Sequence, residues 1–226
     1  MLRGVGLRKT FRGPDGRPIE VLRGVDLSLT PGEQVAVVGR SGSGKSTLLN
    51  LLGGLDRADG GQLWFGDQEL TRAGRRALAR FRGRYLGFVF QSFHLIPSLT
   101  AWENVLLAAR YLRRDQSEAG RAAAALFERL GIAERRDHYP AALSGGEQQR
   151  VAFCRAVLND PEVILADEPT GNLDEENANA ILEELRARAA TGGAAVLLVT
   201  HSAELARAAD RVLHLTAGRL GSQAAG

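Results

Sequence analysis

Residues 33–47 read EQVAVVGRSGSGKST, an apolar run that leads into a glycine-rich loop and then into a helical segment. Residues 39–46 match the pattern G-x-x-x-x-G-K-[S/T], and strand, loop and helix are the context that this pattern requires. Glycines let the backbone N–H groups point at phosphate oxygens, and the helix adds its positive N-terminal end. The loop therefore predicts binding of a nucleoside triphosphate, with these residues as candidates: Gly39, Arg40, Ser41, Gly42, Ser43, Gly44, Lys45, Ser46 and Thr47.

Lysine is almost absent from this chain, which makes its presence in the loop informative. Two of the 29 basic residues, Lys9 and Lys45, are lysines, and the other 27 are arginines. A compact ammonium at position 45 can reach the β- and γ-phosphates, where a planar guanidinium would be too broad. We therefore expect Lys45 to act in catalysis, and the Ser46 hydroxyl to ligate Mg²⁺.

A second motif, VILADE at residues 163–168, is an apolar run that ends in two carboxylates. It places Asp167 and Glu168 at the carboxyl end of a central strand, where open α/β sheets bind their ligands. Asp167 is expected to hold Mg²⁺, directly or through water, and Glu168 to polarise the attacking water. Two carboxylates after a strand are a weak signal alone, but they become a strong one beside a phosphate loop.

Composition narrows the class of protein. The chain has 226 residues, 44% hydrophobic and 24% charged, which suits one sizeable domain or one domain with a small lobe. No apolar run approaches the roughly 18 residues that cross a bilayer, and the N-terminus lacks the apolar core of a secretory signal. A single cysteine, Cys154, fits a reducing compartment and excludes disulfide or cysteine-based zinc frameworks. We expect a cytoplasmic chain, and a net charge of +3 is too small to indicate nucleic acid.

Strand-like and helix-like segments alternate along the chain. Residues 2–11 and 19–29 flank the turn-rich GPDGRP and predict an antiparallel hairpin. Further strands are expected near residues 33–39, 61–70, 85–90, 161–167, 194–200 and 211–216, and helices near residues 46–55, 75–84, 101–131 with a break at Asp115, 144–158 and 174–190, with a short one after His201. This pattern predicts one α/β nucleotide-binding domain over 1–226. Its phosphate-loop core would have a parallel sheet, an antiparallel β subdomain and an α-helical subdomain inserted at about 92–160.

Residues 143–150, LSGGEQQR, form a second glycine-rich loop, with Ser144 as the expected N-cap of a helix. The first loop alone is compatible with several classes of protein: kinases, recombinases, G-proteins and many ATPases. The second loop distinguishes among these classes. With it, the chain resembles the ATP-binding cassette (ABC) ATPases over nearly its whole length. The resemblance is carried by six motifs in the family's order: GRSGSGKST, FVFQ with Gln91, LSGGE at 143–147, VILADE, GNLD at 171–174, and His201 after a strand.

The resemblance implies a head-to-tail homodimer with two ATP molecules between the subunits. In that family the LSGGE loop faces the ATP held by the second cassette, which implies a role in trans for Leu143, Ser144, Gly145, Gly146 and Glu147. It also implies that Gln91 touches Mg²⁺ or the attacking water and that His201 contacts the γ-phosphate. Asp174 would link the two sites, and Phe11 would stack on adenine, unless it is a strand-end core residue.

Cassettes that do not serve transport fit the sequence poorly. About a hundred residues separate the two glycine loops, too few for the coiled coils of chromosome and repair types. One cysteine excludes the zinc of excision-repair types, and translation-linked types carry two cassettes in one chain. The resemblance therefore implies a subunit that powers separate integral-membrane permease subunits at the cytoplasmic side of the inner membrane.

The stretch SFHLIPSLTAWENV at 92–105 follows Gln91 directly. In the family this region lies at a groove that receives a helix from the membrane partner, so Phe93, Leu95 and Ile96 are candidate contacts. A locally buried loop is the alternative. The basic segment RRALARFRGR could approach anionic lipid, but we favour a solvated helix face. Packing or surface positions are assigned to the remaining histidines and the cysteine: His94, His138, His214 and Cys154.

Within the family, the chain is most similar to the lipoprotein-release and macrolide-export group. Four segments carry this similarity: GGLD, FHLIPSLTAWENV, LSGGEQQRVA and ADEPTGNLD. Macrolide exporters of that group fuse cassette and membrane domain, so a stand-alone lipoprotein-release type is the first choice. It would be an ATPase driving export or extraction of a lipoprotein, lipid or peptide-like substrate. The alternative is a cell-division cassette that acts as a nucleotide-gated activator of a cell-wall enzyme. A small-molecule kinase would not require LSGGE, Gln91 and His201 together.

Overall fold

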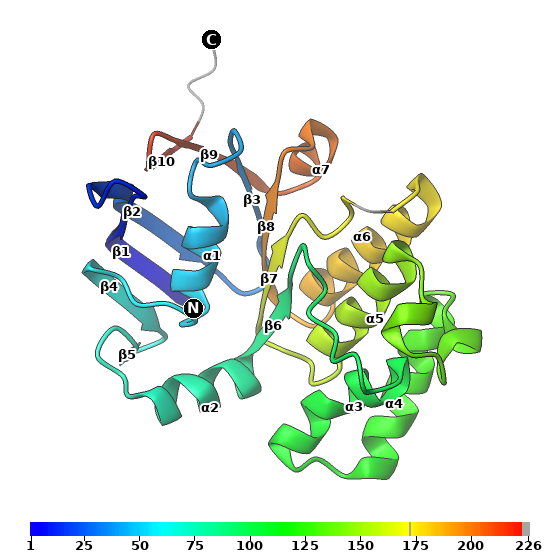
Figure 1. Ribbon diagram of the computed structural model, residues 1–226. Coiled ribbons are helices and arrows are strands. Elements are labelled where there is room, and N and C mark those ends of the chain that lie inside the picture. Colours follow the sequence, from blue (N-terminus) through cyan, green and yellow to red (C-terminus); the bar gives the residue numbers. More distant parts are fainter. Residues whose placement is uncertain (172, 223–226) are drawn as a thin grey trace.

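The structure is a computed structural model that describes residues 1–171 and 173–222, so Asn172 of the GNLD motif lies outside the described residues. A six-stranded sheet runs through the middle of the molecule (Figure 1). A four-stranded antiparallel sheet lies on one side of it, and most of the helices lie on the other. This confirms the predicted fold class of a mixed α/β nucleotide-binding core.

The antiparallel sheet has the strand order β2-β1-β4-β5. Its strands are β1 (Leu2–Arg12), β2 (Pro18–Leu29), β4 (Gly60–Phe65) and β5 (Gln68–Glu69). β1 and β2 form the predicted hairpin, which pairs Phe11 with Ile19 near its tip. Buried and exposed residues alternate along β1, because one face of this sheet packs on the core.

The central sheet has the order β10-β9-β3-β8-β7-β6, with β3, β6, β7, β8 and β9 parallel. Its strands are β3 (Gln34–Val38), β6 (Leu86–Val89), β7 (Val163–Asp167), β8 (Ala195–Thr200), β9 (Arg211–Thr216) and β10 (Arg219–Gly221). Because parallel strands end at the same edge, the segments after β3, β6, β7 and β8 converge there. β10 was not predicted, since three residues are too few for an alternating pattern.

The helices follow the predicted segments closely. They are α1 (Lys45–Leu52), α2 (Arg75–Tyr85), α3 (Ala101–Leu112), α4 (Gln116–Arg129), α5 (Gly145–Val157), α6 (Glu175–Ala190) and α7 (Ala203–Arg207), with 3₁₀ turns at Ala133–Arg135 and Pro140–Ala142. Two local signals separate α3 from α4. Arg113 adopts a left-handed backbone with φ of 55°, and the Asp115 side chain accepts the Glu118 N–H at the start of α4. None of the described helices is long and apolar enough to cross a membrane.

The central sheet separates two apolar cores. Ile164 and Ala166 of β7 pack with the core under α3 to α6, whereas Val163 and Leu165 pack with α1 and the antiparallel sheet. β7 is therefore buried on both faces, as expected for a parallel sheet that is covered on both sides. The helices inserted between β6 and β7 share this sheet as one wall of their core (Figure 1).

Candidate functional site

The loop between β3 and α1 has the backbone that a phosphate cradle needs. Gly42 and Gly44 have φ of 75° and 102°, a region that favours glycine. At Gly44 a Cβ would lie 2.9 Å from Val21 Cγ1, so a side chain there would also clash. Nζ of Lys45 donates hydrogen bonds to the carbonyls of Gly39 at 2.9 Å and Arg40 at 3.1 Å. The ammonium is thus held over the loop, next to the N–H groups that α1 presents.

Asp167, the last residue of β7, lies beside Ser46 at the start of α1. Burial raises the pKa of the Asp167 carboxyl and the nearby Glu168 charge adds to this, while the Ser46 side chain and the Lys45 charge lower it. The two expected metal ligands are therefore neighbours. A hydroxyl, one carboxylate and space for phosphate and water oxygens are donors that Mg²⁺ prefers, so these residues fit that ion.

Glu168 occupies a strained position that its neighbours fix. Its φ is 46°, which is unusual for a residue with a side chain, and its N–H donates to the Val199 carbonyl at 2.9 Å. The residue is 9% exposed. Oε2 accepts the Thr200 hydroxyl at 3.0 Å, and Oε1 lies 2.7 Å from Nδ1 of His201. Such strain persists where surrounding bonds determine the geometry, and it is frequent at functional sites.

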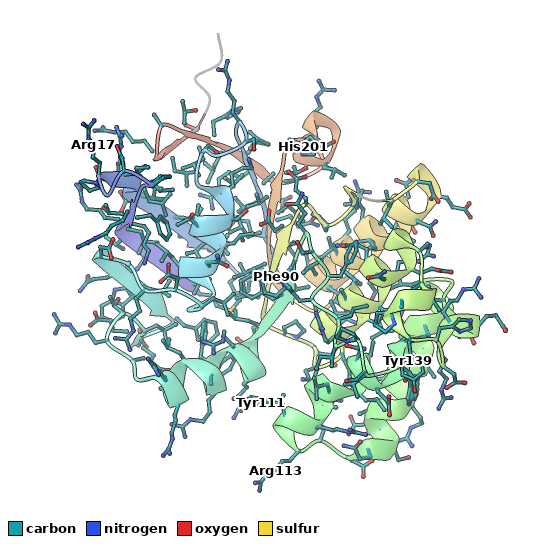
Figure 2. The ribbon with its side chains drawn as sticks, in the orientation of Figure 1. Arg17, Phe90, Tyr111, Arg113, Tyr139 and His201 are labelled. Atoms are coloured by element: carbon teal, nitrogen blue, oxygen red, sulfur yellow. The ribbon has the colours of Figure 1, made fainter. Side chains whose placement is uncertain are left out.

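Most of the predicted residues of the first site share one cavity of about 440 Å³, but Gly39, Arg40 and Ser43 of the predicted loop do not line it. It is lined by Phe11, Val21, Ser41, Gly42, Gly44, Lys45, Ser46, Thr47, Gln91, Asp167, Glu168 and His201. Figure 2 shows His201 beside the end of the central sheet, where its ring reaches this cavity. Sequence reasoning missed Thr200 and Val21. A polar residue ending the apolar strand AAVLLVT was the available signal for Thr200.

The second glycine loop begins α5 with a capping box. The Ser144 hydroxyl accepts the Glu147 N–H at 3.2 Å, and the Ser144 N–H donates to Glu147 Oε2 at 2.7 Å. The Arg135 guanidinium lowers the pKa of Glu147 to about 2. The hydrogen bonds with Ser144 add to this effect, and burial opposes it. The Gly145 and Gly146 N–H groups make no hydrogen bond within the described part of the chain, so this helix end can accept an anion.

This second loop faces a different cavity from the first. The second cavity is lined by Gln91, Ser92, Phe93, Ser144, Gly145, Gly146, Arg150, Leu173, Asp174 and Asn177. Of the residues that the structure describes, Gln91 alone lines both cavities. Asp174 caps α6 by accepting the Asn177 N–H at 2.9 Å, and hydrogen bonds from Asn177 lower the pKa of its carboxyl. The Leu143 side chain points into the helical core instead.

The three expected partner contacts do not form one surface. Phe93 lines the second cavity, Leu95 packs against the helical core, and Ile96 is exposed. Phe93 and His94 have φ of 53° and 48°, and the Arg155 guanidinium binds both of their carbonyls.

An apolar groove does lie nearby, between α2, α3, α5 and β6. It is lined by Arg82, Gly83, Leu86, Phe88, Phe90, His94, Leu107, Ala108, Tyr111, Arg155, Ala156 and Asn159. Phe88 and Phe90 stack with ring centroids 4.6 Å apart, and the His94 ring meets Phe90 edge-on. Figure 2 shows Phe90 near the central sheet and Tyr111 beside α2, and both residues line this groove. His94, which we assigned to packing or surface, thus lines a groove that Phe93 and Leu95 do not.

Comparison with known proteins gives consistent results. Residues 22–171 match the protein-family model described as ABC transporter. Over 208 residues the chain is 50% identical to the lipoprotein-releasing system ATP-binding protein LolD of Pseudomonas fluorescens, covering 92% of this chain and 91% of that one. It is 47% identical over 216 residues to the pyoverdine export ATP-binding/permease protein PvdT of Pseudomonas syringae pv. tomato, covering 94% of this chain and 32% of that one.

Among solved structures, the chain is similar to a dimer of the ATP-binding cassette MJ0796 in a post-hydrolysis state bound to ADP and Pi. The TM-score is 0.93, the sequence identity is 34%, and the match covers all of both chains. The likeness therefore includes both the central sheet and the helical insertion.

Proposed function

Because this chain belongs to the ABC transporter family of ATPases, we propose that it hydrolyses ATP to power separate membrane subunits that release lipoproteins. The observation that carries the hydrolytic part is the Glu168 carboxylate, held by Thr200 and His201 in one cavity with Lys45. The likeness to a lipoprotein-releasing ATPase over more than nine tenths of both chains supports the substrate class. The site of action would be the cytoplasmic side of the inner membrane.

In the proposed reaction, the phosphate loop binds the triphosphate while Lys45 turns from the Gly39 and Arg40 carbonyls to the β- and γ-phosphates. Ser46, Asp167 and Gln91 are the candidate Mg²⁺ ligands, and bound Mg²⁺ would neutralise charge that develops on the phosphates. Phe11, 43% exposed at the edge of the cavity, is available to stack on adenine.

Glu168 is proposed to orient the attacking water and accept its proton. Thr200 fixes one carboxylate oxygen, so the other oxygen can exchange His201 for water. The His201 side chain is 76% exposed, which leaves it free to turn to the γ-phosphate when ATP is bound. Its bond to Glu168 would then give way to one with the substrate.

Each ATP would be completed by the second loop of another copy. The Gly145 and Gly146 N–H groups and the Ser144 hydroxyl lie in a cavity apart from the chain's own phosphate loop, so they are available to a partner's γ-phosphate. Asp174 lines the same cavity, where it could link the two sites. Hydrolysis removes the γ-phosphate from between the subunits, and the dimer would then open.

The apolar groove is proposed to receive a helix from the membrane subunit. Its walls carry aromatic side chains, and one of them, Tyr111, is 56% exposed. Phe90 lines this groove, and the next residue, Gln91, lines both cavities near the nucleotide. Closing of the dimer around ATP would therefore reach the membrane subunit through two adjacent residues.

The test is co-purification of the chain from membranes with ATP present, followed by reconstitution of the complex in vesicles. We expect an integral-membrane partner, and ATP-dependent release of a lipoprotein from the vesicles that stops in Glu168→Gln. A complex that hydrolyses ATP and activates a cell-wall enzyme, without releasing lipoprotein, would contradict the proposed substrate class while leaving the ATPase function intact.

A further inference from the structure

The small net charge of the chain hides a large asymmetry. Residues 70–114 contain nine arginines and one acidic residue, Glu103, whereas the rest of the chain contains 20 basic and 25 acidic residues. The segment therefore carries a net charge of +8 and the remainder −5, which together give +3. Glu103 is itself engaged in the capping box that begins α3.

Three of these nine arginines lie on one stripe of α2. Arg76, Arg80 and Arg84 recur every four residues and are exposed, on the side of the helix opposite the buried Leu78 and Phe81. Residues spaced in this way lie above one another on a helix surface. α2 contains no acidic residue, so the stripe is a row of like charges.

The end of α3 extends this row. At Gly83 of α2 a Cβ would lie 2.3 Å from a ring carbon of Tyr111, so the two helices touch where α3 ends. Arg110 and Arg113 flank that contact, and Figure 2 shows Tyr111 and Arg113 at this end of the molecule, next to α2. We call the combined surface the basic face; its members are Arg76, Arg80, Arg84, Arg110 and Arg113.

The basic face has no counterion of its own. All five arginines are exposed, and none forms an ion pair with any residue that the structure describes. Other arginines of the chain are paired, such as Arg114 with Glu118 and Arg188 with Asp160. Five unpaired like charges in a chain that elsewhere has an acidic excess create a local positive field suited to an extended anionic surface.

The groove proposed for the membrane subunit is built from the same two helices, since Gly83 of α2 and Leu107 and Tyr111 of α3 line it. A helix that enters this groove from the membrane would bring the basic face close to the lipid. We propose that the basic face binds anionic phospholipid headgroups beside the membrane subunit. This rests on the proposed function, which supplies the membrane partner, and it replaces the solvated helix face that the sequence favoured.

The expected strength of lipid binding follows from the number of arginines that face the bilayer. An arginine close to an anionic bilayer surface contributes about fivefold to binding, so three of them contribute on the order of 100-fold. The attraction falls off within a Debye length, about 8 Å at physiological salt and about 3 Å at 1 M, so high salt should abolish it. An apolar insertion would not show this salt dependence.

The experiment is co-sedimentation of the purified chain with vesicles of phosphatidylcholine alone or mixed with phosphatidylglycerol. We expect binding to the mixed vesicles only. The variant Arg76→Gln, Arg80→Gln, Arg84→Gln should bind them on the order of 100-fold more weakly. The matched control, Arg121→Gln, Arg186→Gln, Arg219→Gln, has the same net charge but changes exposed arginines outside residues 70–114, and should bind almost as well as the wild type.

Equal loss in both variants would show that net charge alone binds the vesicles and would overturn the assignment, as would equal binding to neutral vesicles. Binding of a duplex DNA oligonucleotide in preference to the vesicles would also overturn it. ATP-driven dimerisation and hydrolysis are measured on the same preparations. If they fail, the proposed function is wrong; if they persist while vesicle binding is absent, the lipid assignment alone is wrong.

Discussion

Oε1 of Glu168 lies 2.7 Å from Nδ1 of His201, although the two residues are 33 positions apart in the chain. The contact exists because β7 and β8 are adjacent parallel strands, so the residues that follow them meet at one edge of the sheet.

Glu168→Gln should retain ATP binding and nearly stop turnover, by a factor of about 10² to 10⁴, because an amide keeps the shape but cannot accept the proton. The variant should accumulate an ATP-bound dimer, measured by light scattering with bound nucleotide. Glu162→Gln, at the exposed start of the same strand region, is the control and should hydrolyse ATP normally. Turnover near the wild-type rate would remove Glu168 from the base role.

Thr200→Val should lower the hydrolysis rate about tenfold with little change in ATP affinity. The buried hydroxyl is a hydrogen-bond donor to Glu168 Oε2, and valine has the same shape but leaves that oxygen without its partner. Thr200→Ser keeps the hydroxyl and should recover most of the rate. Equal rates in the valine and serine variants would show that Thr200 does not position Glu168.

The sequence predicted those features of the site that depend on a few adjacent residues. The Ser144 cap, the break at Asp115 and the loop before Lys45 each follow from a few adjacent residues, and all three are where the sequence placed them. The Thr200 bond to Glu168 depends on strand order, and Arg155 binds the carbonyls of residues 61 and 62 positions away. Such contacts form only when distant segments pack against each other. No local pattern in the sequence therefore predicts them.

Lys45→Arg should weaken ATP binding by at least about tenfold, or about 1.4 kcal/mol, despite keeping the charge. The ammonium fits over the loop, where it donates to two backbone carbonyls 2.9 and 3.1 Å away, and a planar guanidinium needs more room. Calorimetric titration with ATP measures the affinity, and an unchanged melting temperature without nucleotide excludes misfolding. Equal affinity would mean that charge alone, and not the shape of lysine, matters at this position.

The capping box at Ser144 should make stability depend on acid pH. The folded pKa of Glu147 is about 2, below its ordinary value of 4.5, so its contribution is complete above about pH 4.5 and is lost as the pH falls towards 2. Because Arg135 is exposed and water screens this ion pair, we expect about 1 kcal/mol rather than the full shift. Urea unfolding should show Glu147→Gln less stable than wild type by that amount at pH 7 and nearly equal at pH 2.

The control for that measurement is Glu134→Gln, which changes an exposed carboxylate next to the same arginine. It should leave the free energy of unfolding almost unchanged at both pH values. A difference for Glu147→Gln that persists at pH 2 would point to lost packing instead of a lost charge.

The position of the second loop in a cavity of its own gives a test that single variants cannot give. Ser144→Arg places a long cation where the γ-phosphate of the partner's ATP should lie, so it should block dimer closure while leaving ATP binding to the monomer intact. Lys45→Ala should block ATP binding itself.

In a mixed dimer, one composite site carries both changes and the other carries neither. With Glu168→Gln in both chains to prevent turnover, neither variant alone should form an ATP-bound dimer, whereas the mixture should trap one ATP per mixed dimer. If Ser144 instead acted on the ATP of its own chain, both sites of the mixed dimer would be damaged, and no trapped ATP would be found.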